Sequence, residues 1–261
     1  MVAPPCNPHL GLVKFTHSLP RLAASLQSGR RTKIVAIGSS STAGEPSPKT
    51  GEVEIVPYPA RLELFLRKHH YGRMIDVLNR GLGGQEAPEE LSRFESDVIG
   101  ENPALVIWQI GSNAVFHQQS YSYDDVQAAI VAGLDWLTKL RIDVILMDLQ
   151  YTRKILDINT DSKARGHTGP DGTNMGFADD IELRIESVAQ RAGVNLFKRW
   201  ALMQQWVADR IGIDVDDLTD PDDTSDHLHM SEWATACVSR ALLGAIEDAP
   251  PPKPADCEPV S

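Results

Sequence analysis

A serine-rich turn follows one of the apolar runs of the sequence. Residues 33–37 are largely aliphatic and lead directly into residues 38–44, GSSSTAG. A serine at such a turn points its hydroxyl away from a sheet, the glycines permit a tight bend, and the following amides lie near a helix start, where anions are favoured. These features suit a nucleophile together with an oxyanion site. A Ser/Thr turn that only caps a helix is the alternative interpretation of these residues alone.

Three further segments carry polar residues at related places. Residues 79–84 (NRGLGG) and 111–113 (GSN) each follow an apolar run, and residues 226–229 (DHLH) precede the last helical segment. A carboxylate and an imidazole three residues apart lie on one side of a turn, and a neutral imidazole is the natural base near pH 7. Together with residues 38–44, these segments resemble in order the four blocks of the SGNH (GDSL-like) hydrolases, and the resemblance covers residues 33–246.

The resemblance implies roles for five residues. Ser40 is expected to be the nucleophile, His229 the general base and Asp226 its orienting acid. The chemistry needs these types, because a hydroxyl attacks poorly until an imidazole takes its proton and the imidazole needs a carboxylate to fix its tautomer. The backbone amides of Ser40 and Gly84 and the side-chain amide of Asn113 are expected to form the oxyanion hole. The resemblance implies no cofactor and no metal.

The sequence departs from the family pattern at two places. Ser39 stands where the family has the Asp of its Gly-Asp-Ser turn, and Ala114 stands where an Asp often follows the third-block Asn. Neither position is a nucleophile, base or oxyanion donor in the family. We therefore predict a divergent member in which the local hydrogen bonds of the nucleophile turn differ.

The elements that must position these residues alternate along the chain. Runs of β-branched and aliphatic residues predict five buried strands, at residues 33–38, 75–79, 104–110, 142–149 and 194–197. Helical periodicity predicts six helices, at residues 59–70, 88–99, 123–140, 177–192, 199–211 and 231–246. Such alternation predicts an α/β protein of the flavodoxin-like type, a three-layer α/β/α sandwich around a five-stranded parallel sheet, which is also the SGNH hydrolase fold. Ligands bind outside the carboxyl ends of such strands, where the loops from residues 38, 79 and 111 begin.

Segments outside this scheme set the expected boundaries. We predict an N-terminal arm over residues 1–31, one hydrolase domain over residues 32–248, and a disordered proline-containing tail over residues 249–261. Residues 44–58 and 151–176 are expected to be long loops, and the second follows a strand at its carboxyl end, where it could shape a substrate cleft.

Composition excludes several classes of protein. The chain has 261 residues, 42% of them hydrophobic, and a net charge of −11, with no block of Lys and Arg to bind nucleic acid or an anionic membrane. It has no apolar stretch long enough to span a bilayer, and residues 1–30 lack the basic-then-apolar order of a signal peptide. The three cysteines are too few for a disulfide framework. A bridge between Cys6 and Cys237 would join the arm to the last helix, but burial as free thiols is the favoured interpretation.

Other residues have simpler interpretations. His69 and His70 are expected to cap a helix, and Trp108 and Met147 are expected in the core. A metal held by Asp226, His227 and His229 is disfavoured against the triad. Residues that end the third and fourth strands are candidates to line a pocket, namely Gln109, Asp148 and Gln150, and Arg80 and Gln85 are expected either to contact substrate or to face solvent.

The expected reaction is hydrolysis of a carboxylic ester through an acyl-enzyme. An esterase that removes an acetyl group from a carbohydrate or another hydroxylated compound fits the resemblance best. A thioesterase or a short-chain lipase is the second choice. Phosphate binding at residues 38–44 is disfavoured because a phosphate loop requires a Lys there, and a non-catalytic carbohydrate-binding relative is disfavoured because the four blocks keep their key residues. This substrate class favours the periplasm or the cell exterior, and the cytoplasm stays open, as do the oligomeric state and the natural substrate.

Overall fold

The computed structural model describes residues 5–44, 56–209, 212–220 and 227–253 of the chain. Five parallel strands form one sheet in the order β2-β1-β3-β4-β5. Their bounds are β1 Thr32–Gly38, β2 Ile75–Gly81, β3 Leu105–Gln109, β4 Asp143–Met147 and β5 Asn195–Phe197. The predicted five-stranded parallel sheet and its flavodoxin-like order are confirmed.

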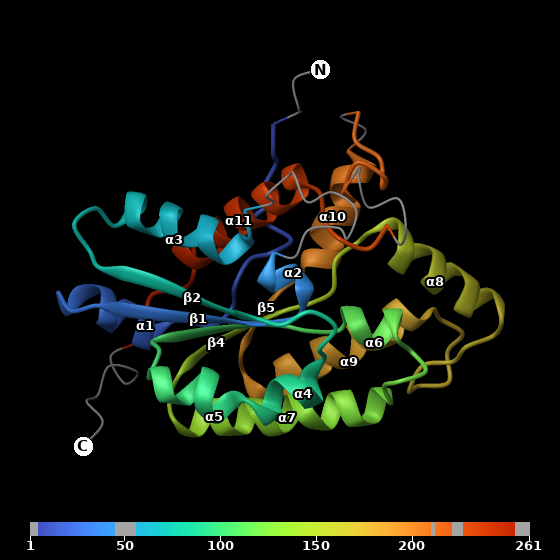
Figure 1. Ribbon diagram of the computed structural model, residues 1–261, viewed down its shortest axis with the longest axis horizontal. Coiled ribbons are helices and arrows are strands. Elements are labelled where there is room, and N and C mark those ends of the chain that lie inside the picture. Colours follow the sequence, from blue (N-terminus) through green and yellow to red (C-terminus); the bar gives the residue numbers. More distant parts are fainter. Residues whose placement is uncertain (1–4, 45–55, 210–211, 221–226, 254–261) are drawn as a thin grey trace.

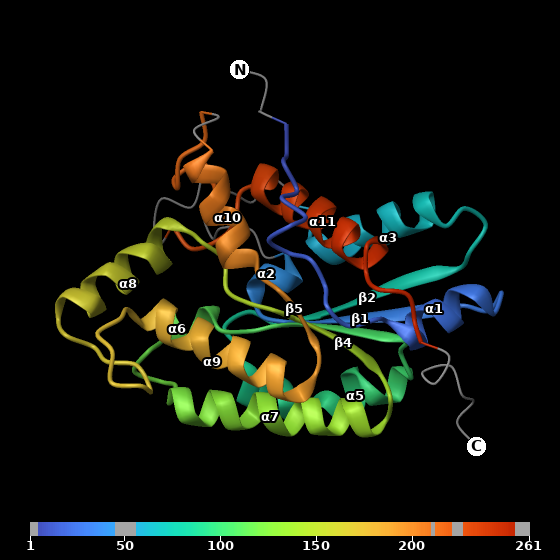
Figure 2. The ribbon, with the colours of Figure 1, turned by 180° about the vertical axis from the view of Figure 1, so that it is seen from behind.

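Helices cover both faces of the sheet (Figures 1 and 2). One face carries α3 (Tyr58–His69), α10 (Arg199–Ala208) and α11 (Glu232–Glu247), and the other carries α4 (Ala87–Ser92), α5 (Phe94–Asp97), α7 (Tyr123–Lys139) and α9 (Phe177–Ala192). Because both faces are covered, the residues of β1, β3 and β4 are nearly all buried, which is why these strands appear in the sequence as aliphatic runs. The edge strand β2 is buried only at Ile75 and Val77. Trp108 and Met147 are fully buried, as predicted.

The structure differs from the predicted helices and loops in three segments. The helix predicted over residues 88–99 is divided into α4, α5 and a 3₁₀ turn at Ile99–Glu101, because Arg93 leaves the helical conformation with φ −110° and ψ 11°. The loop predicted over residues 151–176 contains the twelve-residue helix α8 (Arg153–Ala164). The arm before β1 also contains a helix, α1 (Pro20–Gln27), which the sequence did not predict.

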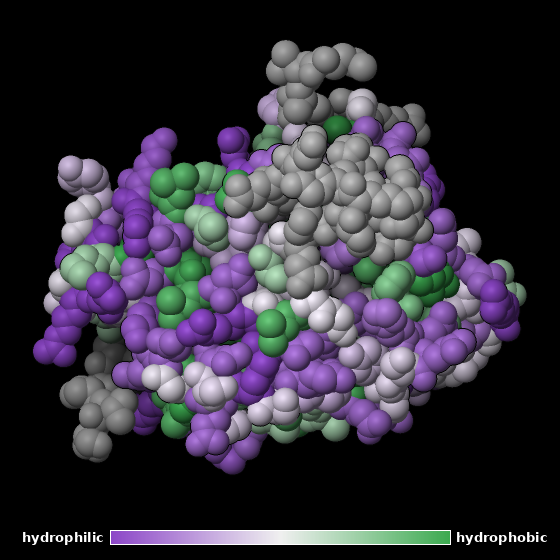
Figure 3. All heavy atoms as spheres, viewed as in Figure 1, coloured by the Kyte–Doolittle hydropathy of each residue, from purple (hydrophilic) through white to green (hydrophobic). Residues whose placement is uncertain are grey.

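Short helices begin at the carboxyl ends of two strands and carry the predicted site residues. These are α2 (Ser40–Ala43), after β1, and α6 (Ser112–Phe116), after β3. The face shown in Figure 3 is mostly hydrophilic, with hydrophobic residues in small scattered groups. Within the part of the chain that the structure describes, no helix is long and apolar enough to cross a membrane.

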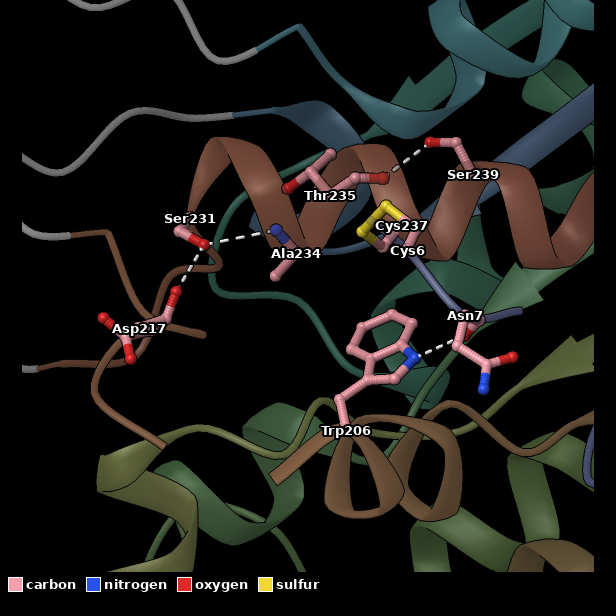
Figure 4. The surroundings of a disulfide bond; sticks show 9 residues. All are labelled: Cys6, Asn7, Trp206, Asp217, Ser231, Ala234, Thr235, Cys237 and Ser239. Carbon is pink, nitrogen blue, oxygen red and sulfur yellow. Dashed lines mark hydrogen bonds between the residues drawn. A yellow bond between two sulfur atoms is a disulfide. The ribbon is translucent and has the colours of Figure 1, made fainter. Parts of the chain in front are cut away.

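A disulfide joins the start of the chain to α11 (Figure 4). Cys6 and Cys237 are bonded, with their Cα atoms 5.3 Å apart across 231 residues of sequence. The preference for free thiols at these two positions is therefore wrong, and Cys257 lies outside the described residues. The arm reinforces this connection, because Trp206 Nε1 donates a hydrogen bond of 2.6 Å to the backbone oxygen of Asn7. The division at residues 31 and 249 stays a prediction, and most of the predicted tail lies outside the described residues.

Candidate active site

Ser40 is the first residue of α2, one residue beyond Ser39, which follows the carboxyl end of β1. The backbone amides of Thr42 and Ala43 each donate a 3.0 Å hydrogen bond to the oxygen of Ser39, which forms a tight turn. The helix ends at Gly44, whose φ of 80° favours glycine, and a Cβ there would meet Pro57 at 2.5 Å. This turn leaves the amide of Ser40 at a helix start, where backbone N–H groups are not used within the helix.

The side chain of Gln109 stabilises the turn that carries Ser40. Its Oε1 accepts hydrogen bonds from the backbone amide and hydroxyl of Ser39, at 3.1 and 3.0 Å, and from the hydroxyls of Ser41 and Thr42, at 2.9 and 3.2 Å. Gln109 ends β3, the strand next to β1, and is fully buried. Ser39, which replaces the family Asp, is thus fixed by a neutral amide. Three side chains that flank Ser40 in sequence share one acceptor.

Arg199 connects this turn to the segment that carries the predicted base. Its guanidinium is fully buried and donates to Ser41 Oγ at 3.1 Å, to Gln150 Oε1 at 3.0 Å and to the backbone oxygen of Asp148 at 3.0 Å. Gln150 in turn donates from Nε2 to the oxygen of Leu228 at 3.4 Å, one residue before His229. Burial lowers the pKa of Arg199 to about 10, so the group stays charged at neutral pH.

The loop after β2 packs against α2. The amide of Leu82 donates a 2.9 Å hydrogen bond to the oxygen of Gly38, and a Cβ on Gly81 would meet the nitrogen of Ala43 at 2.1 Å. Gly84 lies farther along this loop, exposed and with a φ of 78°. Its carbonyl accepts a 3.1 Å hydrogen bond from the Tyr121 hydroxyl, which fixes the orientation of that peptide.

Asn113 lies in α6, on the other side of β1 from β2, and reaches towards the loop of Gly84. Its Nδ2 donates a 2.7 Å hydrogen bond to the backbone oxygen of Gln85. The structure therefore places the predicted second-block and third-block residues next to each other. An amide NH₂ group has two hydrogens, so this bond leaves Asn113 with a second donor.

A buried glutamate supports the turn that carries Asn113. Glu86 is 1% exposed and accepts 2.9 Å hydrogen bonds from the amides of Gly111 and Ala114. Ala114, where the family often has an Asp, is thus held through its backbone. Burial raises the pKa of Glu86, and burial and the nearby Glu86 carboxyl raise the pKa of Glu90 well above its ordinary value. Trp108 Nε1 donates to Glu90 Oε2 at 2.7 Å.

His229 and Ser40 line the same small cavity, of about 20 Å³, together with Ser41, Gly44, Pro57, Met230 and Thr235. The segment of His229 is fixed from the backbone, because the amide of Asp220 donates to the oxygen of His229 at 2.8 Å and Thr219 forms a bridge with Met230. The hydroxyl of Ser231, which caps α11, also donates to the oxygen of Asp217 at 2.8 Å (Figure 4).

The structure therefore brings together some of the predicted residues. Ser40 lies with His229, and Gly84 lies with Asn113, all at the carboxyl edge of the sheet. Asp226 lies outside the described residues, so its role as orienting acid stays a prediction, and so does the disfavoured metal site that includes it.

Two of the remaining candidates make contacts within the protein. Arg80 Nη2 donates to Glu101 at 2.7 Å, and Gln85 Oε1 accepts from Arg93 Nε at 2.7 Å. Sequence reasoning missed Arg199 and Glu86. For Arg199, the available signal was its place two residues after a predicted strand. For Glu86, the signal was its spacing of three residues from Glu89, as in a capping box.

Fold and site geometry together define an α/β/α hydrolase-like protein whose polar residues gather at the carboxyl edge of a parallel sheet. The model of the Non-GDSL lipase-like family matches residues 5–168, more than half of the chain. The chain belongs to this family. The resemblance to SGNH (GDSL-like) hydrolases predicted from the four blocks is confirmed.

Solved structures share this fold at low sequence identity. An acetylxylan esterase from Geobacillus stearothermophilus is 21% identical, with 82% of this chain and 94% of that chain covered and a TM-score of 0.61. An alpha/beta hydrolase from the metagenome of Lake Arreo, Spain, is 18% identical, with 85% and 99% covered and a TM-score of 0.63. A protein of the G-D-S-L family from Desulfitobacterium hafniense is 20% identical, with 82% and 99% covered and a TM-score of 0.58. A comparison with curated proteins gives no match.

Proposed function

We propose that this protein is a serine esterase that hydrolyses carboxylic esters through an acyl-enzyme on Ser40. The observation that carries the proposal is the shared cavity of Ser40 and His229 at the carboxyl edge of the sheet. Membership of a lipase-like family supports it. So does the fold shared with an acetylxylan esterase, of which catalytic serine and histidine variants have been solved.

In the proposed reaction, Ser40 Oγ attacks the ester carbonyl while His229 takes its proton. The amides of Ser40 and Gly84 and the Nδ2 of Asn113 stabilise the oxyanion, and His229 then protonates the leaving alcohol. In the second half, His229 removes a proton from water, which attacks the acyl carbon, and His229 returns this proton to Ser40 Oγ as the bond to the acyl group breaks and the acid leaves. Asp226 is proposed to hold the imidazole in the required tautomer.

The proposed substrate carries a small acyl group, such as acetate, on a carbohydrate or a similar hydroxylated compound. The cavity beside Ser40 is small, and the acetylxylan esterase with the same fold acts on an acetylated carbohydrate polymer. A thioesterase or a short-chain lipase is second. We also propose an oxidising compartment, the periplasm or the cell exterior, because the Cys6–Cys237 disulfide persists under such conditions.

Release of p-nitrophenol from its acetate, butyrate and octanoate esters tests the reaction. We expect activity in wild type that falls with chain length, and labelling of Ser40 by a fluorophosphonate probe, read by intact mass and peptide mapping. Ser40→Ala and His229→Ala should lose activity by several orders of magnitude, because residues of one catalytic unit overlap in effect. The matched controls Ser120→Ala and His117→Ala change exposed residues and should keep wild-type rates. Full activity in Ser40→Ala would refute the assignment, and a folded but inactive and unlabelled wild type would favour a binding protein.

A further inference from the structure

Two histidines and a glutamate meet where α3 and α11 end. His69 is the last residue of α3, His70 is its C-cap, and Glu247 is the last residue of α11. His69 Nε2 lies 3.3 Å from Glu247 Oε2, and His70 Nε2 lies 2.8 Å from Glu247 Oε1. The two imidazole rings are 5.0 Å apart at their centroids. Both rings therefore direct the same nitrogen to one carboxylate.

The ends of the two helices explain this arrangement. α3 and α11 run side by side in the same direction (Figures 1 and 2), joined at their starts by an ion pair between Arg61 and Glu232. Neighbouring residues within a helix do not face each other. His70 has left the helix, with φ −101° and ψ 60°, which lets its ring turn to the same side as that of His69.

We propose that His69, His70 and Glu247 bind a divalent transition metal ion, with Zn²⁺ as the best fit. The three donor atoms lie within 4.8 Å of one another. In a tetrahedral Zn²⁺ site, the bonds to His nitrogen and Glu oxygen are about 2.0–2.1 Å long, so neighbouring donor atoms lie about 3.3 Å apart. His69 Nε2 and Glu247 Oε2, which are 3.3 Å apart, already have that spacing. His70 Nε2 lies 2.8 Å from the other carboxylate oxygen, Oε1, so the carboxylate and this ring would have to turn slightly to share one ion. Two imidazoles select such ions over Mg²⁺ and Ca²⁺, which prefer oxygen ligands.

The surroundings leave room for the remaining ligand. His70 and Glu247 line a cavity of about 330 Å³ together with Arg73, Pro250–Pro252 and several residues of α1. With three protein ligands, a water molecule from this cavity would complete the tetrahedron. The side chains are 53%, 25% and 20% exposed for His69, His70 and Glu247, so the ion can enter without unfolding of either helix.

The proposed ion has no part in ester hydrolysis. α11 begins three residues after His229, and the metal site is at the opposite end of that helix. Binding would join the ends of α3 and α11 and raise the unfolding temperature, because the folded chain offers a site that the unfolded chain lacks. Its failure would leave the esterase proposal unaffected, since activity is measured separately on the same samples.

Zn²⁺ binding to the untagged full chain, measured by competition with a chromogenic chelator at pH 7.5, tests the proposal. We expect wild type to bind one equivalent of Zn²⁺. Glu247→Gln and His70→Ala should bind Zn²⁺ at least about tenfold more weakly, since even a change in a residue that only contacts a metal ligand costs this much. His17→Ala, a matched control with an exposed imidazole, should bind as wild type does. Zn²⁺ should raise the unfolding temperature of wild type and of the control by several degrees more than that of the two variants.

A second measurement keeps the test independent of the variants. Paramagnetic Co²⁺ added to wild type should broaden the NMR signals of the His69 and His70 rings before those of His117 and His229. The proposal is overturned if wild type binds no Zn²⁺ in excess metal, if both variants bind as tightly as wild type, or if Co²⁺ first affects histidines other than His69 and His70.

Discussion

Arg199 donates a hydrogen bond from Nη1 to the hydroxyl of Ser41, 3.1 Å away, and so touches the residue that follows the proposed nucleophile. The same guanidinium holds Gln150, which donates to the backbone oxygen of Leu228, the residue before His229. One buried cation therefore fixes both the turn of the proposed nucleophile and the segment of the proposed base. We infer that Arg199 is a positioning residue for the reaction.

Replacement of Arg199 by lysine should lower the rate without removing any reacting group. An ammonium is a point charge and cannot reproduce the planar fork that reaches three acceptors at once. A small misplacement of reacting groups can cost about a hundredfold in rate, so we expect kcat on p-nitrophenyl acetate to fall by roughly tenfold to a hundredfold with KM nearly unchanged. The free energy of unfolding should fall by roughly 2–4 kcal/mol, because buried acceptors lose their donor.

A variant that is destabilised outside the site shows whether a loss of kcat in Arg199→Lys comes from misplaced reacting groups or from lower stability. Leu62→Ala removes a fully buried side chain of α3 and should cost roughly 2–5 kcal/mol of unfolding free energy. Well below both unfolding temperatures, it should keep the kcat of wild type, while Arg199→Lys should not. Equal kcat in Arg199→Lys and wild type would contradict the inference.

Asn113→Ala should mainly affect kcat. If Asn113 Nδ2 stabilises the oxyanion, its loss removes an interaction made in the transition state, and the expected decrease is about a hundredfold to a thousandfold. Asn113→Asp, which keeps the shape but has no NH₂ group, should be as slow as Asn113→Ala. Gln118→Ala, an exposed change shortly after α6, is the matched control. A kcat within a few-fold of wild type in both Asn113 variants would exclude this side chain from the oxyanion hole.

The sheet could be predicted from sequence because the strands β1, β3 and β4, which are covered on both faces, are mainly aliphatic, whereas α8 could not be predicted. The residues that α8 buries are Ile155, Asn159 and Ser162, so two of the three are polar. Asn159 is buried because its Oδ1 accepts hydrogen bonds of 2.9 and 3.2 Å from the amides of Ala178 and Asp179, at the start of α9. The large apolar residues of α8 are confined to Ile155, Leu156 and Ile158 in its first half, and its second half is mainly polar, so the sequence predicts a loop there.

The site was predictable to a similar, partial degree. Short segments whose order matches a family singled out Ser40, Gly84, Asn113 and His229, which lie at the carboxyl edge of the sheet, and their catalytic roles stay predictions. Arg199 was not, because its function depends on contacts with residues 41 and 150, which lie far from it in sequence. The sequence alone also disfavoured the disulfide, since two cysteines 231 residues apart show no spacing that marks a pair.

Loss of the disulfide should destabilise the protein without changing its chemistry. Cys6→Ala should lower the free energy of unfolding by about 2–5 kcal/mol, because the bond restricts the unfolded chain over a very long loop. For a chain of this size that corresponds to a decrease of roughly 5–15 °C in unfolding temperature. Calorimetry of wild type in reductant should give the same decrease, and reductant should not affect Cys6→Ala further. An unfolding temperature of wild type that is independent of reductant would show that the bond does not form.

Asp143, which begins β4 at the edge of the sheet opposite the site, should make the free energy of unfolding depend on pH. Its carboxyl accepts a 2.8 Å hydrogen bond from the amide of Leu22, but burial dominates and raises the pKa of Asp143 to about 7. Between pH 4 and 7 the folded protein therefore holds a proton that the unfolded chain has released. The stability that Asp143 contributes is fully present below the pKa of the unfolded chain and is lost as the pH rises through the folded pKa.

Asp143→Asn should remove this dependence. The free energy of unfolding of wild type, measured by urea denaturation from pH 4.5 to 7.5, should fall more steeply with pH than that of the variant, by up to about 1.4 kcal/mol per pH unit for one proton. The variant should be the more stable of the two at pH 7.5, because an amide is neutral and can still accept from Leu22. Asp157→Asn, which changes an exposed carboxylate of α8, should retain the slope of wild type. Parallel curves for wild type and Asp143→Asn would mean that Asp143 is ionised in the folded protein throughout this range.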